Sequence, residues 1–138
     1  AAGAPAQLVP ARLEGREIAL AGAQLRALQI RPREADVDVA TLMGLEAASL
    51  LDTGVIPTVQ VSVEKIFTSE LRQRIADLAI DLLGPDGLLA HRTNGAPAHG
   101  VFERLYRAAP LMRFGGGTNE VQRDIVAMAG LGLPHYKS

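Results

Sequence analysis

The spacing of apolar residues along the chain predicts helices. The clearest case is the segment 60–83, where apolar side chains recur every three or four positions and charged side chains fall between them. Glu70 and Arg74 stand four residues apart in the order that favours an ion pair on an exposed helix face. The apolar stripe consists of Val63, Ile66, Phe67, Leu71, Ile75, Leu78, Ala79 and Leu82.

Two further helices are predicted before this segment. Residues 12–30 have a rough helical period, and Pro32 should end that helix because proline lacks the backbone N–H and clashes with the preceding turn. Residues 33–53 are apolar on much of the helix circumference, which predicts a central position in the fold. Gly54 is a natural end for this second helix, and Pro57 prevents its continuation.

Short helices separated by breakers are predicted after the long segment. The run GPDG at 84–87 should end the long helix and form a turn. A polar loop over 90–99 then leads to a helix over 101–111. The last predicted helix covers 118–129 and ends at Gly130.

These elements together predict an all-α fold, an up-and-down bundle of about five helices. We expect the bundle to occupy residues 11–134 of the chain. A flexible Ala/Pro/Gly-rich segment at 1–10 should precede it and a tail at 135–138 should follow it.

Composition narrows the classes of partner. The chain has 138 residues, enough for one domain with its own core, and no cysteine that could form a disulfide or a thiolate metal site. Its net charge of −1 argues against a nucleic-acid or anionic-membrane surface. No apolar run reaches the roughly 20 residues that a bilayer-spanning helix needs. We therefore expect no nucleic-acid partner, no membrane partner and a cytoplasmic location.

The most informative motif is the glycine run before the last predicted helix. Gly115, Gly116 and Gly117 allow positive φ and close approach of another molecule. Thr118 suits a helix N-cap, and Glu120 suits the positive end of the helix dipole. The free N–H groups at such a helix start can receive an anion or a bound cofactor, although a tight loop between two helices has the same pattern.

Other catalytic patterns are missing from the sequence. His91, His99 and His135 do not have the spacing of metal ligands with nearby acids, so no metal site is expected. The serines that fall inside predicted helices have no histidine at a suggestive position, and no Gly-x-Ser-x-Gly elbow is present. Covalent catalysis is therefore not expected.

Three segments together resemble the C-terminal helical domain of the acyl-CoA dehydrogenases. The segment SVEKIFTSE at 62–70 is similar to the start of that family's long penultimate helix, and LLGPDGL at 82–88 to the turn that ends it. The segment GGTNEVQRDIVA at 116–127, followed by GLGLP at 130–134, is the most specific match. The order and spacing of the three fit, with a good match over 59–134 and a loose one over 11–53.

The resemblance implies a flavin site and a reaction. Family members use FAD to desaturate an acyl-CoA thioester between its α and β carbons, with a glutamate as base. The flavin contacts carried over to this chain would come from the start of the last helix, with a weaker set at the turn that meets a flavin bound mainly by a neighbouring subunit. These residues are Gly117, Thr118, Asn119 and Glu120, and in the weaker set Asp81, Gly84 and Pro85.

Two departures from the family pattern concern the chemistry. Gly116 stands where many relatives carry the catalytic glutamate, so no catalytic residue is assigned to this chain. Asp81 stands where a glutamine often meets the flavin, and an anionic side chain beside a pyrophosphate is unfavourable. The family's N-terminal helical domain and middle β domain have no counterpart in the sequence.

Three interpretations remain open from the sequence. In the first, the chain is part of an FAD-dependent acyl-CoA dehydrogenase whose base and remaining domains lie elsewhere. In the second, it is a non-catalytic subunit of a mixed oligomer that completes a neighbour's flavin site, and in the third it is a helical interaction module without a cofactor. We expect a homo- or hetero-oligomer. The apolar segments 33–53 and 118–131 predict a buried subunit interface.

Overall fold

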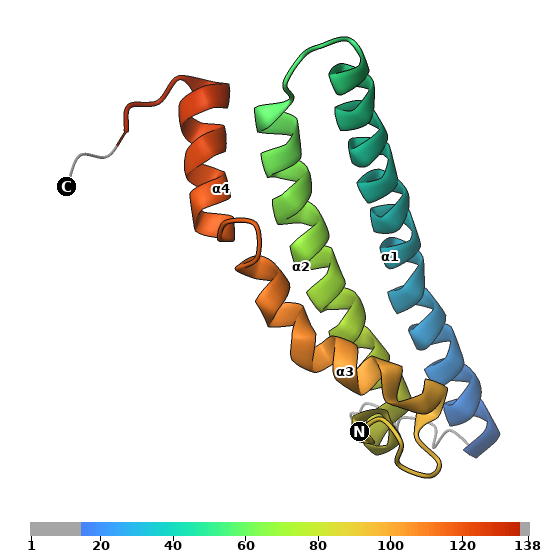
Figure 1. Ribbon diagram of the computed structural model, residues 1–138. Coiled ribbons are helices and arrows are strands. Elements are labelled where there is room, and N and C mark those ends of the chain that lie inside the picture. Colours follow the sequence, from blue (N-terminus) through green and yellow to red (C-terminus); the bar gives the residue numbers. More distant parts are fainter. Residues whose placement is uncertain (1–14, 136–138) are drawn as a thin grey trace, which may run out of the picture.

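The computed structural model describes residues 15–135, which form helices joined by turns and loops and contain no strand (Figure 1). The all-α prediction is therefore confirmed, with four α-helices in this part of the chain rather than about five. Most of the predicted flexible segment and tail, at 1–10 and 135–138, lies outside the described residues. The α-helices are α1 (Gly15–Asp52), α2 (Thr58–Leu83), α3 (Val101–Ala108) and α4 (Asn119–Ile125).

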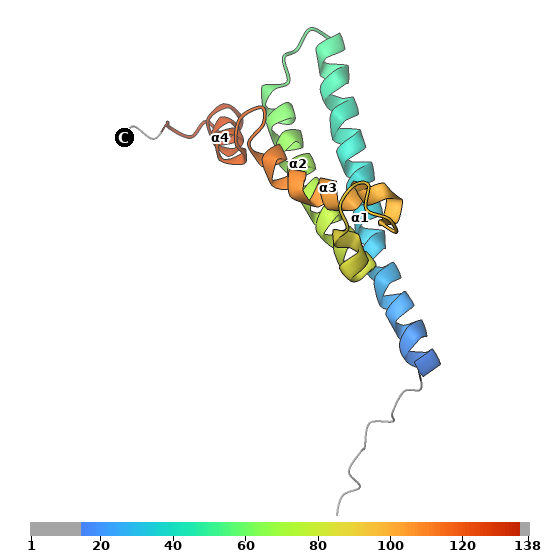
Figure 2. The ribbon, with the colours of Figure 1, turned by 60° about the horizontal axis from the view of Figure 1, so that its bottom comes forward.

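The helices follow an up-and-down course. α1 and α2 run antiparallel, and the chain then returns along the other side of α2 through α3 and α4 (Figures 1 and 2). Single turns join the helices: η1 (Gly84–Leu88) after α2, η2 (Pro97–Gly100) before α3 and η3 (Ala109–Arg113) after it. A π-type turn, η4 (Val126–Gly130), extends α4 to the predicted glycine.

The prediction that Pro32 ends a helix is wrong. α1 runs through it and is 38 residues long in total, so the two helices predicted at 12–30 and 33–53 are one. A proline inside a helix removes one backbone hydrogen bond and costs about 3 kcal/mol, which bends or weakens a helix without necessarily ending it. Helical residues on both sides keep α1 continuous past that position.

The predicted long helix at 60–83 is confirmed as α2, and α2 takes the central position that was expected for 33–53. It packs against α1 on one side and against α3, η3 and α4 on the other. On α1, by contrast, Leu42 and Leu45 are 64% and 62% exposed. The apolar circumference of α1 is therefore uncovered on its outer side, which is why the expectation of a central 33–53 helix fails.

Few apolar side chains are buried in this arrangement. Among the described side chains, the buried apolar ones are Ala47, Pro57, Leu71, Ala76 and Ala109. Many large apolar side chains remain exposed on α1, on the α1–α2 connection and around the glycine run. Exposed apolar surface of this extent is typical of faces that pack against other protein.

The predicted ion pair between Glu70 and Arg74 does not form. Glu70 instead lies 2.6 Å from Arg123 on α4, and Arg74 lies 3.8 Å from Asp36 on α1. The two side chains are drawn to opposite flanks of α2 because each meets an opposite charge on a neighbouring helix. Arg74 also stands over the ring of Phe67, 5.8 Å from its centroid.

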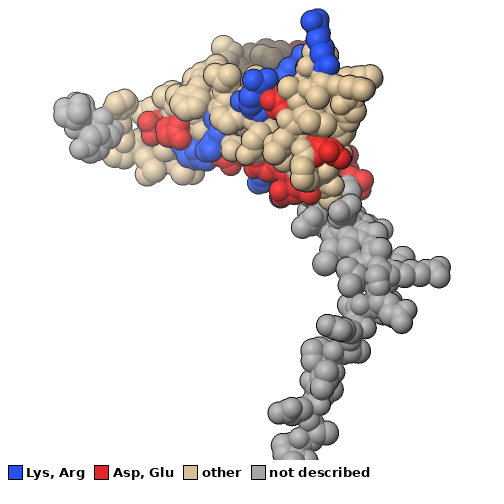
Figure 3. All heavy atoms as spheres, turned by 90° about the horizontal axis from the view of Figure 1, so that it is seen from below, with Lys and Arg blue, Asp and Glu red and all other residues tan. Residues whose placement is uncertain are grey.

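No described helix is long and apolar enough to cross a membrane. Figure 3 shows the molecule from below, where basic and acidic side chains occur side by side. Neither sign covers that face, which is consistent with the net charge of −1.

Candidate functional site

The glycine run forms a loop between η3 and α4, with the backbone that the sequence predicts. Gly116 and Gly117 have φ values of +71° and +91°, in the left-handed region that glycine adopts without strain. The Thr118 side chain accepts a hydrogen bond of 3.2 Å from the backbone N–H of Val121, so the predicted N-cap is confirmed. Glu120 lies in the first turn of α4, where its charge suits the helix dipole.

The two positive-φ glycines, Gly116 and Gly117, differ in the room that each has for a side chain. The Gln122 side chain donates a 3.0 Å hydrogen bond from Nε2 to the carbonyl of Gly116. A Cβ on Gly117 would lie 2.8 Å from that Nε2, whereas a Cβ on Gly116 would meet nothing within 4 Å. Gly117 is therefore required by both its conformation and its neighbour, and Gly116 by conformation alone.

Asn119 is the centre of a polar cluster beneath the loop. It is fully buried, at 0% exposure. Its Oδ1 accepts from Lys65 Nζ at 2.7 Å and lies 3.0 Å from Ser69 Oγ, and its Nδ2 donates to Glu70 at 3.3 Å. A direct contact of Asn119 with a cofactor, as the resemblance implied, does not fit this burial; the residue instead fixes the start of α4 to α2.

Lys65 reaches both ends of the loop. In addition to Asn119, its Nζ donates to the backbone carbonyl of Arg113 at 3.0 Å. Arg113 is the last residue of η3 and Asn119 is the first of α4, so one ammonium group holds the residues that flank the glycines. An ammonium group has three donors and no acceptor, which suits it to bridging two oxygen atoms.

Charged groups flank the loop. Partial burial raises the pKa of the Glu70 carboxyl, but the hydrogen bond and charge of Arg123 outweigh this effect. Together with the hydrogen bond from Asn119 and the charge of Arg113, they leave the pKa of Glu70 below its ordinary value. For Glu120, a hydrogen bond from its own backbone N–H and then one from the Thr118 hydroxyl lower the pKa. Both carboxylates are therefore ionised at neutral pH.

The structure separates the two predicted groups of cofactor residues. Gly117 and Glu120 are exposed and Thr118 half-exposed at one place, the start of α4. Asp81 and Pro85, both exposed, lie with Gly84 at the far end of α2. Asp81 follows Ser69 by twelve residues on this helix, roughly 18 Å along the axis at about 1.5 Å per residue. The two groups do not form one compact site within the chain.

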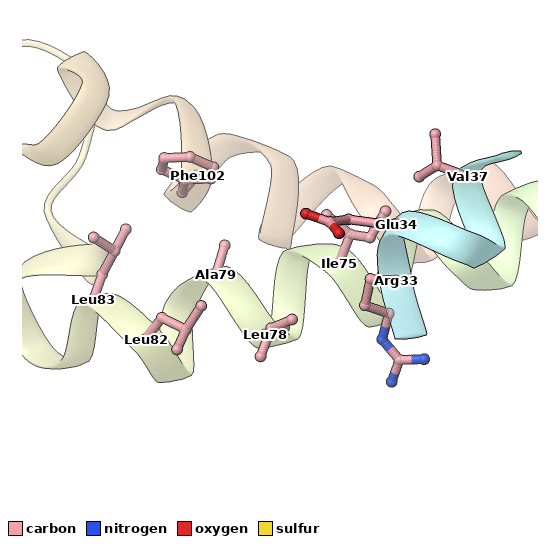
Figure 4. Close-up of a pocket in the computed structure, with 9 residues that line it drawn as sticks. All are labelled: Arg33, Glu34, Val37, Ile75, Leu78, Ala79, Leu82, Leu83 and Phe102. Atoms are coloured by element: carbon pink, nitrogen blue, oxygen red, sulfur yellow. The ribbon is translucent and has the colours of Figure 1, made fainter. Parts of the chain in front are cut away.

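An apolar hollow lies beside the second group (Figure 4). Its volume is about 340 Å³, and it is formed where α1, α2 and α3 meet. Sequence reasoning missed it, because the hollow depends on how three helices come together and only the α2 stripe signalled it. Its lining consists of Arg33, Glu34, Val37, Ile75, Leu78, Ala79, Leu82, Leu83 and Phe102.

The histidines show no sign of metal chemistry within the described residues. His91 Nδ1 lies 2.8 Å from the carbonyl oxygen of His99 and closes the loop between α2 and α3. No group of three or more His, Asp and Glu side chains in residues 15–135 is arranged to hold a metal ion. The histidine contact is thus a loop closure.

Lys65 and Gln122 are the site residues that the sequence reasoning missed. Lys65 lies inside the segment quoted for the resemblance, but nothing marked it as a contact of the glycine loop. A usable signal was the presence of a serine at the buried position Ser69 of α2. A buried hydroxyl needs hydrogen-bond partners, which for Ser69 come from Asn119 and from the helix backbone.

The chain matches the model of a known protein family. The family model described as "Acyl-CoA dehydrogenase, C-terminal domain" matches residues 12–131. This range includes both groups of predicted cofactor residues and the whole polar cluster around Asn119. It also agrees with the segments that carried the resemblance.

Curated relatives point the same way. The chain is 40% identical over 104 residues to "Acyl-CoA dehydrogenase FadE26" of Mycobacterium tuberculosis, a match that covers 72% of this chain and 26% of that protein. It is 36% identical over 92 residues to "Probable acyl-CoA dehydrogenase YngJ" of Bacillus subtilis, covering 67% of this chain and 22% of the relative. The chain thus spans about a quarter of the length of these proteins.

Solved structures share the arrangement of helices. A chain of the ChsE4-ChsE5 complex from Mycobacterium tuberculosis has a TM-score of 0.74 at 36% identity, over 80% of this chain and 29% of that one. A chain of the Tcur3481-Tcur3483 steroid ACAD has a TM-score of 0.77 at 25% identity, over 81% of this chain and 29% of that one. In both, the helices found here make up less than a third of the matched chain.

Proposed function

The chain belongs to the acyl-CoA dehydrogenase family, in which it matches the C-terminal domain, and we propose that it serves as this domain of an FAD-dependent acyl-CoA dehydrogenase. The reaction is the α,β-desaturation of an acyl-CoA thioester. The observation that carries the proposal is the glycine loop, with positive φ at Gly116 and Gly117 and a capped helix start whose first residue, Asn119, is hydrogen-bonded to Lys65 of α2. The remaining domains come from protein outside the described residues.

The exposed residues of the loop fit a flavin contact. Gly117 and Gly116 present backbone without side chains, and Thr118 offers a hydroxyl at the helix start. The ionised Glu120 suits hydroxyl or N–H donors of a ligand and does not suit a phosphate. When bound, FAD supplies the acceptor for the hydride that leaves the substrate. In this proposal Gly117, Thr118 and Glu120 hold the cofactor, and Asn119 acts only by fixing their positions.

The base for this reaction comes from outside the loop. Gly116 has no side chain that could abstract a proton. Glu70 is bound to Arg123, and Glu120 is hydrogen-bonded at the start of its helix, and both pKa values are lowered. A general base works best when its pKa lies near the working pH, so neither carboxylate is suited to remove an α proton.

Assembly with further protein completes the proposal. The second group, Asp81, Gly84 and Pro85, lies too far along α2 to share a compact site with the loop and is proposed to meet the flavin of a neighbouring subunit. One structural relative is a complex of two differently named proteins, and another is called a steroid ACAD. These relatives support a hetero-oligomer and make steroid-derived acyl-CoA the first substrate class to assay. The cytoplasmic location stays a prediction from the sequence.

A non-catalytic partner subunit is the second candidate. The observation that favours it is Gly116, together with the unsuitability of both nearby carboxylates as a base. In this case the chain completes the flavin site of a neighbour and contributes packing surface, while the chemistry occurs on the neighbour. A helical interaction module without a cofactor is the third interpretation.

Flavin content tests the proposal. We would co-express the chain with a chain that carries the N-terminal and middle domains, purify the complex and record the flavin absorbance spectrum. Bound flavin, and its bleaching when acyl-CoA is added, is the expected result. If no combination of chains retains flavin, both the enzymatic and the partner-subunit interpretations fail.

Substitution at Gly116 separates the two flavin-dependent interpretations. With an external base, Gly116→Glu should leave the rate of substrate-dependent flavin reduction unchanged or lower it. Activity that appears only in Gly116→Glu would instead mark a subunit without its own base. Gly116→Gln is the matched control, because it has the same size and carries no base.

A further inference from the structure

We infer that Lys65 is the positioning residue of the glycine loop: its ammonium group ties the two ends of the loop together and so keeps the loop in the form that receives the cofactor. The tie itself follows from contacts within the chain. Its consequence for the cofactor rests on the proposed function.

The contacts of Lys65 join two points that the sequence separates. Nζ donates to the carbonyl of Arg113 at 3.0 Å and to Oδ1 of Asn119 at 2.7 Å. Five residues, 114–118, lie between these two points and include all three glycines. Glycine-rich backbone loses more conformational freedom on ordering than any other, so the loop needs contacts of this kind at its ends.

The ammonium group of Lys65 is not held in place by an ion pair with a carboxylate of the described residues. Within the described residues, no carboxylate oxygen lies within 4.0 Å of Lys65 Nζ, whereas Glu70 pairs with Arg123 and Arg113. The lysine is half-buried, and its partners are a backbone carbonyl and a side-chain amide. A charged donor to neutral oxygens forms a stronger hydrogen bond than a neutral donor does, which suits a group that must hold two points at once.

The middle of the loop is held independently. Gln122 from α4 donates to the Gly116 carbonyl, and this contact does not involve Lys65. Loss of the Lys65 contacts should therefore loosen the ends of the loop while α4 and its Thr118 cap remain. The inference therefore predicts a change in amide hydrogen exchange that is confined to residues 113–119.

The test compares substitutions at two cationic residues of α2, Lys65 and Arg72, in the purified complex. Lys65→Met removes both hydrogen bonds and keeps a side chain of similar length, and Lys65→Gln is a second variant with a shorter neutral donor. Arg72→Met is the matched control, because Arg72 is an exposed cation on the same helix. We would measure amide hydrogen exchange over 113–119 and the dissociation constant of the flavin.

Faster exchange at the loop is the expected result. In both Lys65 variants, the amides of Phe114 and Gly115, which donate to the Leu111 carbonyl at the start of the loop, should exchange at least tenfold faster, with α1 and α2 unchanged and Arg72→Met like the wild type. Unchanged loop exchange in a folded Lys65 variant would overturn the tie. This arm does not depend on flavin, so it decides the inference even if the wild-type complex binds none.

The flavin arm tests positioning. The dissociation constant should rise at least tenfold in Lys65→Met and stay the same in Arg72→Met. Faster loop exchange with unchanged flavin affinity would overturn the positioning role. Absence of flavin from the wild-type complex would instead overturn the proposed function, and with it the cofactor consequence of the tie.

Discussion

The two halves of α2 face opposite kinds of neighbour. Between Lys65 and Glu70, α2 meets the glycine loop through polar side chains that find their partners inside the chain. Between Ile75 and Leu83, it borders an apolar hollow of about 340 Å³ with exposed apolar residues on the adjoining helices. The loop end is thus specified by contacts within the chain, whereas the hollow end leaves apolar surface uncovered. Substitutions at the two ends should therefore differ in size and in sign.

The largest effect is expected from Asn119→Ala at the loop end. The substitution removes the hydrogen bonds that Lys65, Ser69 and Glu70 make to a side chain that is 0% exposed, while Lys65 keeps the Arg113 carbonyl and Glu70 keeps Arg123. Because each hydrogen bond contributes about 0.5–1.5 kcal/mol, and more where one partner is charged, we expect a loss of about 3 kcal/mol in the free energy of unfolding. Urea denaturation at fixed protein concentration measures it.

Asn94→Ala is the control for that prediction, because Asn94 is exposed in the loop before α3. It should change the free energy of unfolding by less than about 0.5 kcal/mol. If the two asparagine variants lose the same stability, the polar cluster does not fix the loop, and the contrast between the two ends of α2 fails.

The next effect separates two adjacent glycines of the loop. Gly116→Ala should cost about 1 to 2 kcal/mol, the penalty of a left-handed conformation for a residue with a Cβ. Gly117→Ala carries the same penalty and also displaces the Gln122 amide that bonds the Gly116 carbonyl, so about 2 to 3 kcal/mol is expected. Equal losses for the two variants, again from urea denaturation, would show that Gln122 yields without cost.

The loop end was also the part that the sequence predicted best. Positive φ at Gly116 and Gly117, the Thr118 cap and the course of α2 all follow from local rules of glycine conformation, capping and helical period. What local rules do not specify is the direction in which a side chain points. Asn119 was expected to face a cofactor and is buried against α2, because Lys65 and Ser69 lie directly below it.

The other differences have the same origin. Pro32 predicted a helix end from its own chemistry, but the helix on each side of it determines the outcome. Glu70 and Arg74 have ideal spacing for a pair along one helix, yet each finds a partner on another helix. The apolar hollow has little local signal, since only the α2 stripe indicates it and α1, α2 and α3 each contribute part of its wall. The sequence pattern does not determine which side chains of different helices meet.

At the hollow end, an added side chain should stabilise the protein. Ala79 lines the hollow, and Ala79→Leu places three more carbon atoms in it. At about 0.8 kcal/mol for each fully buried CH₂, and with the hollow open on one side, we expect a gain of about 1 kcal/mol in the free energy of unfolding. Thermal and urea denaturation both measure it.

Ala35→Leu serves as the matched variant, since Ala35 is exposed on α1. It should change stability by less than about 0.5 kcal/mol. A loss of stability in Ala79→Leu would mean that the added carbon atoms do not fit the hollow. Weaker association of the chain with its partner would mean that other protein already occupies the hollow in the assembly. Both ends of α2 would then be covered by protein in the assembly, the loop end by its own chain and the hollow end by a partner.

The smallest effect concerns Glu70, whose side chain lies partly exposed to solvent at the loop end of α2. Its side chain is 31% exposed, so its pairs with Arg123 and Arg113 should contribute less than about 1 kcal/mol. The pKa of Glu70 is lowered in the folded protein, so this contribution is present above the unfolded pKa of about 4.3. It is lost as the pH falls through the folded pKa, because the protonated carboxyl no longer attracts the two arginines.

Glu70→Gln should therefore be less stable than the wild type by a constant amount from about pH 8 down to about pH 5, and the difference should shrink below about pH 4. Urea denaturation across this range measures the difference, with Glu46→Gln at an exposed position of α1 as control. A difference that grows on acidification would mean that the folded pKa is raised, and that burial rather than Arg123 dominates at this residue. Glu70 would then have the environment of a proton acceptor, and the argument that places the base outside the loop would have to be revised.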